Sequence, residues 1–276
     1  MGNQLSSDDP KKQSRYVQIL VHIFEAHYTD GCKAFEFERR EIESAAASLG
    51  VVLPKNLGDL LYSFRFRTKL PDIITRTAPD GFHWNIEGAG RGRYRMILRK
   101  VNRIVPSENH LKIKIPDATP EIVTAYALSD EQALLAKVRY NRLIDIFLRV
   151  TAYSIQNPLR TSVPEIGQIE TDEVYVAVNN SGNQFVIPVQ AKGGSDQIGI
   201  VQVMQDLALC RKAFPLLTPR PVAVQFVRDE TGEIIVMFEL VEKEGELLVA
   251  DEKQYRLVPA RQIGEDDLAE YRRDRD

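Results

Sequence analysis

Apolar residues recur with helical spacing in the first quarter of the chain. They lie three or four positions apart between residues 16 and 27 and again between residues 55 and 66, which predicts two helices that each bury one face. An Ala-rich segment, residues 41–49, lies between them and ends at Gly50, a residue that suits a helix C-terminus. The pattern therefore predicts three consecutive helices.

A different pattern follows the third predicted helix. Residues 82–86 and 94–98 are short runs rich in aromatic and branched side chains, and a glycine-rich segment separates them. We expect two strands joined by a turn that carries Arg91 and Arg93. No helical pattern follows the glycines, so the segment is not interpreted as a dinucleotide-binding loop, which needs a helix N-terminus.

The second half of the chain begins with a proline-rich segment, residues 106–128, which predicts a linker. Ser129 is then expected to begin a long amphipathic helix that ends before Pro158. The domains expected from these boundaries are a flexible N-terminus (1–13), a first domain (14–105), the linker (106–128), a second domain (129–263) and a charged tail (264–276).

The second domain continues with alternating strands and helices. Residues 168–178 and 185–192 predict a β-hairpin around an Asn- and Gly-rich turn. A helix over residues 197–212 and strands over 222–227 and 233–241 are expected to follow. The fold class predicted for the chain is therefore α/β (α+β), with a mixed sheet flanked by helices behind a helical, basic first domain.

Composition is typical of an ordinary globular protein. The 276 residues suit two domains, and 43% of them are hydrophobic and 27% charged. Cys32 and Cys210 lie far apart without zinc-finger spacing, which favours a reducing, cytoplasmic setting. The longest uncharged stretch, residues 174–191, holds three asparagines, so we expect no membrane partner. The four histidines share no spacing with a Ser or Cys nucleophile, which disfavours a triad hydrolase.

Charge is distributed unevenly along the chain. The net charge is −3, but residues 1–105 hold 17 Lys and Arg against 12 Asp and Glu, so this part carries +5 and the remainder −8. Residues 55–103 alone carry 11 basic against four acidic side chains. A solvated face is the ordinary interpretation of a charge run, whereas a basic segment with this arrangement also suits a polyanion such as DNA.

Three helices followed by a basic hairpin resemble a winged helix-turn-helix domain over about residues 14–103. The resemblance implies that the third helix and the residues beside it face the major groove of DNA, while the hairpin tip approaches the backbone or the minor groove. The DNA-binding residues expected from it are Lys55, Asn56, Arg65, Arg67, Lys69, Arg91 and Arg93. Trp84 is expected in the core instead of stacking on bases.

Four polar side chains mark the ends of the predicted hairpin in the second domain. Residues two apart in a strand share a face, so Glu170 and Asp172 are expected to point together, as are Gln190 and Lys192. Burying such groups among apolar strand residues is unfavourable unless they bind each other or a ligand. Mg²⁺ prefers one or two carboxylates together with water and substrate phosphate, so a magnesium site is one expectation.

These residues resemble the PD-(D/E)XK nucleases, which have the restriction endonuclease-like fold, and among them the Mrr-like members with Gln-X-Lys. The resemblance covers roughly residues 130–240. It implies that Asp172 is the metal carboxylate, that Gln190 is the second metal position and that Lys192 positions or activates the attacking water. Mg²⁺, with Mn²⁺ as a substitute, is the implied cofactor, and no organic cofactor is expected.

Two positions depart from the motif of these nucleases. Thr171 stands where the motif has proline, and Gln190 stands where it has an acidic residue. The amide oxygen of Gln190 is still able to coordinate a metal ion, and Glu170 is expected to supply the missing carboxylate.

The function expected from these features is that of a Mg²⁺-dependent DNA endonuclease of a restriction or defence type. It would act on duplex DNA as a homodimer, because the resemblance implies that each site cuts one strand. Three alternatives remain open at this stage. In the first, the side chains form only a surface ion-pair network of Glu170, Asp172 and Lys192. In the second, the chain is a non-catalytic DNA-binding protein such as a regulator or an inactive nuclease relic. In the third, it is an interaction protein with neither property.

Overall fold

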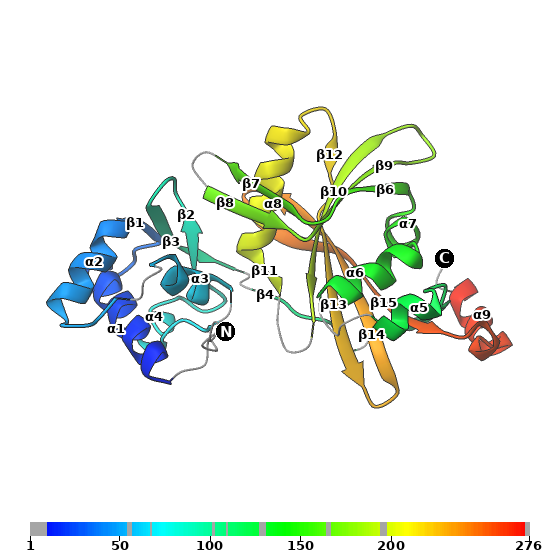
Figure 1. The fold of residues 1–276 in the computed structure, drawn as a ribbon, viewed down its shortest axis with the longest axis horizontal. Coiled ribbons are helices and arrows are strands. Elements are labelled where there is room, and N and C mark those ends of the chain that lie inside the picture. The colour runs from blue at the N-terminus through cyan, green and yellow to red at the C-terminus, as the bar shows by residue number, and fades with distance from the viewer. Residues whose placement is uncertain are drawn as a thin grey trace. The chain divides into compact units, whose positions relative to one another are not determined.

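The structure is a computed structural model, and Figure 1 shows its mixed α+β fold with a large mixed sheet flanked by helices. The chain divides into two compact units, residues 1–102 with 162–168 and residues 103–161 with 169–276, called here the N-terminal unit and the sheet unit. The residues described are 10–53, 57–66, 68–100, 103–108, 110–126, 131–163, 167–193 and 198–273.

The N-terminal unit packs helices against a three-stranded antiparallel sheet of order β1-β3-β2. Its buried core includes the predicted stripe of α1 and the side chain of Trp84, whose Nε1 donates to Thr77 Oγ1 at 2.9 Å. The prediction of three helices and a hairpin is confirmed, while β1 and α4 were not predicted. The elements are α1 (Pro10–His27), β1 (Ala34–Glu38), α2 (Arg39–Ser48), α3 (Gly58–Phe66), α4 (Asp72–Thr75), β2 (His83–Gly88) and β3 (Arg93–Arg99).

The sheet unit is built on an eight-stranded sheet of order β5-β15-β14-β13-β10-β9-β6, to which β12 adds beside β10. Its pairs are antiparallel, except that β10 runs parallel to β12 and β13, and β15 runs parallel to β5. The strands are β5 (Lys112–Pro116), β6 (Thr151–Gln156), β9 (Glu173–Val178), β10 (Gln184–Lys192), β12 (Thr218–Pro219), β13 (Val222–Asp229), β14 (Gly232–Lys243) and β15 (Glu246–Val258).

Helices and two small sheets accompany the large sheet. Two pairs of short strands, β4 with β11 and β7 with β8, form separate two-stranded sheets. The remaining elements are β4 (Arg103–Ile104), α5 (Glu121–Tyr126), α6 (Glu131–Tyr140), α7 (Leu143–Leu148), β7 (Leu159–Val163), β8 (Gly167–Thr171), β11 (Ile198–Gly199), α8 (Ile200–Ala213), η1 (Ala260–Gln262) and α9 (Glu265–Arg273).

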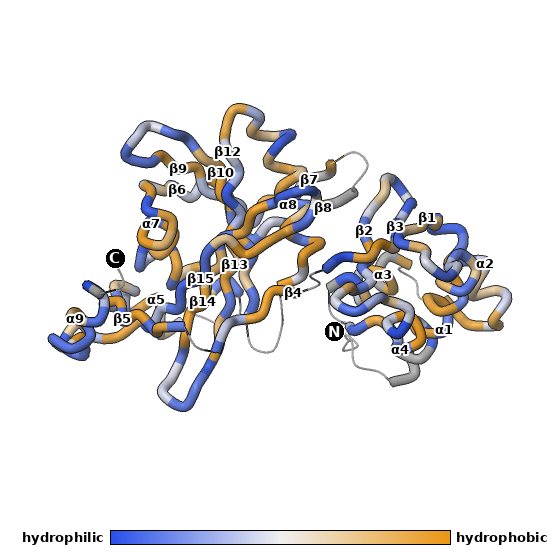
Figure 2. Tube along the Cα trace, turned by 180° about the vertical axis from the view of Figure 1, so that it is seen from behind, coloured by the Kyte–Doolittle hydropathy of each residue, from blue (hydrophilic) through white to orange (hydrophobic). Residues whose placement is uncertain are grey.

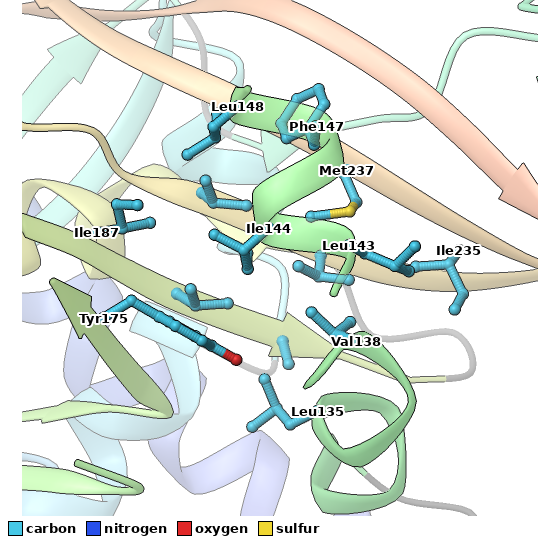
Figure 3. Close-up of a cluster of buried hydrophobic side chains, with 14 of the residues drawn as sticks. Leu135, Val138, Leu143, Ile144, Phe147, Leu148, Tyr175, Ile187, Ile235 and Met237 are labelled. Carbon is cyan, nitrogen blue, oxygen red and sulfur yellow. The ribbon is translucent and has the colours of Figure 1, made fainter. Parts of the chain in front are cut away.

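The large sheet has apolar side chains on both faces. Figure 3 shows α6 and α7 packing on one face, where Ile144 and Phe147 lie against the strand residues Ile187 and Met237. On the opposite face, Cys210 of α8 packs with one residue from each of β9 and β10. Figure 2 shows that hydrophobic residues follow the central strands, whereas α9 is almost entirely hydrophilic. Burial on both faces explains the nearly continuous apolar run in β10.

The long helix predicted from Ser129 to residue 157 is wrong in its second half. Helix α6 ends at Tyr140, α7 begins at Leu143 after the left-handed Arg142, and residues 151–156 form strand β6. The buried side chain of Asn141 interrupts the helix, since its Oδ1 accepts from Ala118 N at 2.7 Å and its Nδ2 donates to Thr119 Oγ1 at 2.8 Å. Pairing of β6 with β9 then replaces the helix. Ser129 lies outside the described residues.

The predicted linker and both predicted tails contain regular structure. Residues 112–116 form β5, the outermost strand beside β15, because parallel pairing with β15 satisfies their backbone. The expected charged tail forms α9, in which Asp267 pairs with Lys114 of β5 at 2.9 Å. Residues 10–13 of the expected flexible N-terminus belong to α1, and residues 1–9 lie outside the described residues.

A carboxylate at the β13–β14 turn makes the stability of the sheet unit depend on pH. Hydrogen bonds from Thr231, together with the charge of Arg256, hold the pKa of Asp229 at about 2. Since the pKa of an unfolded Asp is about 4, the ionised group favours the folded state above pH ~4, and this contribution disappears as the pH falls through about 2.

We therefore predict that Asp229→Asn lowers the free energy of unfolding at pH 7, and that its difference from the wild type narrows as the pH falls from about 4 to about 2. Urea denaturation at a series of pH values measures both effects. Parallel curves for the two proteins over this range would contradict the prediction.

Candidate active site

Asp172 lies where two neighbouring strands separate. The antiparallel ladder between β9 and β10 ends at the pair Glu173 and Val189, and the chain before Asp172 forms β8, which pairs with β7. The Asp172 carboxylate accepts a hydrogen bond from Ala191 N at 2.8 Å through Oδ2. The side chain is thereby fixed against β10 just beyond the last strand pair.

Strand alternation places Gln190 and Lys192 of β10 on one face of the sheet. Val186 of β10 packs on the α8 side, so Gln190 and Lys192, four and six positions later, face the same way. Asp172 lies in the bend between β8 and β9, and alternation does not continue across it, because Thr171 points to Asp206 of α8 and Glu173 does not. Glu173 points to the opposite face, where its buried carboxylate pairs with Arg139 of α6 at 3.0 Å.

Charges of both signs gather around Asp172. Burial raises the pKa of its carboxyl group, while the hydrogen bond from Ala191 and the charge of Lys192 lower it. The Lys192 side chain is only 18% exposed, and its Nζ lies 3.9 Å from Glu131 Oε1 at the start of α6. The charges of Glu131 and Glu170 both raise the pKa of Asp172 further. The site therefore holds the half-buried carboxylate of Asp172, the ammonium group of Lys192 and the carboxylate of Glu131.

Gln190 is buried beneath this cluster and connects it to α8. Its Nε2 donates to Asp206 Oδ2 at 2.9 Å and to the backbone oxygen of Glu170 at 3.2 Å. Asp206 also accepts from Thr171 Oγ1 at 2.5 Å. Burial raises the pKa of Asp206 to about 7, although both hydrogen bonds oppose that rise. Gln190 Oε1 is buried and has no hydrogen-bond partner among the described residues.

Glu170 takes a different position from the one expected. Because β8 pairs with β7 instead of extending β9, the exposed Glu170 carboxylate lies beside β7 and pairs with Arg160 at 2.8 Å. Its charge still acts on Asp172, but its direct contribution to the buried part of the site is the backbone oxygen that accepts from Gln190.

Two site residues were missed by the sequence prediction. Glu131 and Asp206 are far from Asp172 in sequence, and only the packing of α6 and α8 on the sheet brings them near it. The sequence shows that Glu131 is an acidic residue near the start of a predicted helix. Such a residue also stabilises a helix through the helix dipole, so its position alone does not indicate a functional site. The signal for Asp206 was a charge on the apolar face of α8.

The residues at this position fit a hard divalent cation that keeps part of its water. Over the described ranges, no three or more His, Cys, Asp or Glu side chains come close enough to hold a metal ion by themselves. Asp172 and the unpartnered oxygen of Gln190 supply one carboxylate and one amide oxygen, and Glu131 lies near. Mg²⁺ commonly binds through one or two carboxylates, with water and substrate phosphate completing its shell.

The turn between β2 and β3 carries the exposed arginines of the predicted hairpin. Arg91 and Arg93 are both exposed there. Gly90 and Gly92 have φ values of 120° and 70°, which favour glycine, and a Cβ on Gly90 would lie 3.1 Å from the Arg93 guanidinium. Arg39 donates its backbone N–H to Gly92 O at 2.8 Å, which joins the start of α2 to this turn.

Neighbouring basic residues on the same sheet are paired with acids. Arg95 Nη2 lies 2.5 Å from Glu36, and Arg99 Nη2 lies 2.8 Å from Glu87. These pairs neutralise the middle of the sheet, so the turn is the more favourable part of it for a polyanion.

The other predicted DNA-binding residues are placed differently. Arg65 does not extend outward, because its Nε donates to Ile86 O at 3.2 Å and burial lowers the pKa of the guanidinium group. Lys69 is exposed beyond the end of α3. Lys55, Asn56 and Arg67 lie outside the described residues.

Comparison of the chain with protein-family models, with curated proteins and with solved structures gives no match. No helix in the part of the chain that the structure describes is long and apolar enough to cross a membrane.

Proposed function

We propose that the protein is a divalent-metal-dependent endodeoxyribonuclease that hydrolyses phosphodiester bonds in duplex DNA, as the restriction endonuclease-like nucleases do. The observation that carries the proposal is the hydrogen bond to the Asp172 carboxylate from Ala191 N, which lies between Gln190 and Lys192 on β10 and so brings the three residues together. A carboxylate, an amide oxygen and an ammonium group in this arrangement suit a metal ion beside a phosphate.

In this proposal each residue has a separate role. Asp172 and Gln190 would hold Mg²⁺, for which Mn²⁺ is a substitute, and the ion would supply polarisation of the phosphate and a bound water of lowered pKa. The ammonium group of Lys192 stabilises the negative charge that develops on the phosphate oxygens. Glu131, whose Oε1 lies 3.9 Å from Lys192 Nζ, restricts the position of that ammonium group.

The order of elements around the site supports the same proposal. Helix α6 precedes the β9–β10 hairpin, and α8 connects β10 to the parallel strand β13. This order agrees with the resemblance to PD-(D/E)XK nucleases that the sequence motif indicates.

The proposed partner of the N-terminal unit is duplex DNA. Its order of helices and strands, with a sheet of order β1-β3-β2, supports a winged-helix interpretation in which the β2–β3 turn is the wing. Arg91 and Arg93 are the proposed contacts to the DNA backbone. A restriction or defence role, a homodimer and a cytoplasmic location complete the proposal.

A DNA-binding protein without nuclease activity is the second candidate. It is favoured by one specific observation, the buried Gln190 at the position where the motif has an acid. DNA binding without cleavage in the presence of either Mg²⁺ or Mn²⁺ would select this candidate.

We predict that Lys192→Ala retains affinity for duplex DNA and loses Mg²⁺-dependent cleavage by about 100-fold or more, because a single stabilising charge contributes about that much to such a reaction. Conversion of supercoiled plasmid to nicked and linear forms measures the loss. Lys212→Ala, at the exposed end of α8, is the matched control and should cut as the wild type does. Undiminished cutting by Lys192→Ala would refute the assignment.

We also predict that the double variant Arg91→Ala/Arg93→Ala binds duplex DNA about tenfold more weakly and with a smaller dependence on salt. The slope of log K against log salt should decrease by about 0.9 for each phosphate contact that is lost. Fluorescence anisotropy at several NaCl concentrations measures both quantities. The variant Arg228→Ala/Lys243→Ala removes the same charge from exposed positions of the sheet unit. Equal weakening by this control would show that only total charge matters.

A further inference from the structure

The two positions at which the chain departs from the nuclease motif meet at one buried carboxylate. Thr171, in the place of proline, donates its hydroxyl to Asp206 Oδ1 at 2.5 Å. Gln190, in the place of an acid, donates its amide to Asp206 Oδ2 at 2.9 Å. All three side chains are buried, with exposed fractions of 0% for Thr171 and 1% for Gln190 and Asp206. The two departures are therefore parts of one hydrogen-bonded unit centred on α8.

These contacts determine which way the Gln190 amide faces. Its nitrogen has two hydrogens, and the two acceptors, Asp206 Oδ2 and the backbone oxygen of Glu170, use both. Reversing the amide would direct its oxygen at a carboxylate and a carbonyl, with the loss of both hydrogen bonds. Gln190 Oε1 is thereby held on the other side of the amide.

The held oxygen is the second observation that points to a ligand. Gln190 Oε1 is buried and finds no hydrogen-bond donor within the described ranges, although a buried carbonyl normally has one. An oxygen of this kind suits coordination to a cation, and the Asp172 carboxylate is near it, because that carboxylate accepts from the backbone N–H of Ala191, the residue after Gln190.

We infer that Asp206 is a positioning residue of the proposed site, which together with Thr171 orients the Gln190 amide so that Oε1 serves as a cation ligand beside Asp172. The inference rests on the proposed function. It explains why position 190 carries an amide, because a glutamate there would place two carboxylates in buried contact. Positions 190 and 206 are then coupled, and an acid at 190 requires an amide at 206.

Binding of Mn²⁺ to the metal-free full-length protein tests this inference without any measurement of activity. Free Mn²⁺ is counted by electron paramagnetic resonance during a titration. Asp206→Leu, which has nearly the same size but accepts no hydrogen bond, should weaken Mn²⁺ binding about tenfold, because the Gln190 amide loses its fixed direction. Asp206→Asn should bind within about threefold of the wild type, since its oxygen accepts from Gln190 and its amide donates to Thr171 Oγ1.

A double-mutant cycle provides a second test with variants that all remain polar and similar in size. Gln190→Glu alone should not bind Mn²⁺ more tightly than the wild type, because Asp206 opposes the new carboxylate. Gln190→Glu/Asp206→Asn should bind at least about tenfold more tightly than Gln190→Glu, since the amide introduced on α8 would donate to the carboxylate introduced on β10. Circular dichroism of every variant identifies any variant that does not fold. If Asp206→Leu does not fold, the double-mutant cycle alone tests the positioning role of Asp206.

Asp172→Asn separates failure of this inference from failure of the proposed function. If the wild type binds no Mn²⁺, or if Asp172→Asn binds it unchanged, both the metal site and the inference are overturned. If Asp172→Asn weakens binding while the Gln190–Asp206 cycle is additive, the metal site stands and the positioning role of Asp206 is overturned. Weakening by Asp172→Asn together with a non-additive cycle supports both.

Discussion

The hydrogen bond from Ala191 N to the Asp172 carboxylate is the constraint on which the proposed site depends. It forms just beyond the last pair of the β9–β10 ladder, because the preceding strand β8 pairs with β7 and not with β10. The backbone N–H of Ala191 therefore donates to a side chain instead of to a neighbouring strand. This contact keeps Asp172 at the end of β9, beside Gln190 and Lys192. Without it the carboxylate would be free to turn to solvent, and the two strand ends would carry unrelated polar residues.

Apolar packing around this point limits what the polar residues can do. The core under α6 and α7 takes the side chains of Ile187, Val189 and Ala191, which directs Gln190 to the α8 face, while Lys192 at the end of β10 reaches Glu131 of α6. On that face α8 supplies Asp206, whose carboxylate accepts from both strands. The sheet unit thus determines the orientation of the site, while the exposed arginines of the N-terminal unit belong to a separate compact unit.

Local periodicity predicted much of the fold but not the contacts between distant segments. The stripe of α1, the β2–β3 hairpin and the β9–β10 hairpin follow from spacing and turn residues. Strand β6 was assigned to a helix because its apolar residues continue the helical spacing of α7, and only pairing with β9 distinguishes the two. Asp172, Gln190 and Lys192 came from a motif, whereas Glu131 and Asp206 join them through packing that no local pattern encodes.

The most direct test of the account is anomalous X-ray diffraction from crystals of the full chain grown with Mn²⁺. We expect one anomalous peak within coordination distance of both the Asp172 carboxylate and Gln190 Oε1, with Lys192 beside it. An absent peak under conditions that support DNA cleavage would contradict the account. A peak bound elsewhere, with Gln190 Oε1 turned away from Asp172, would contradict it equally.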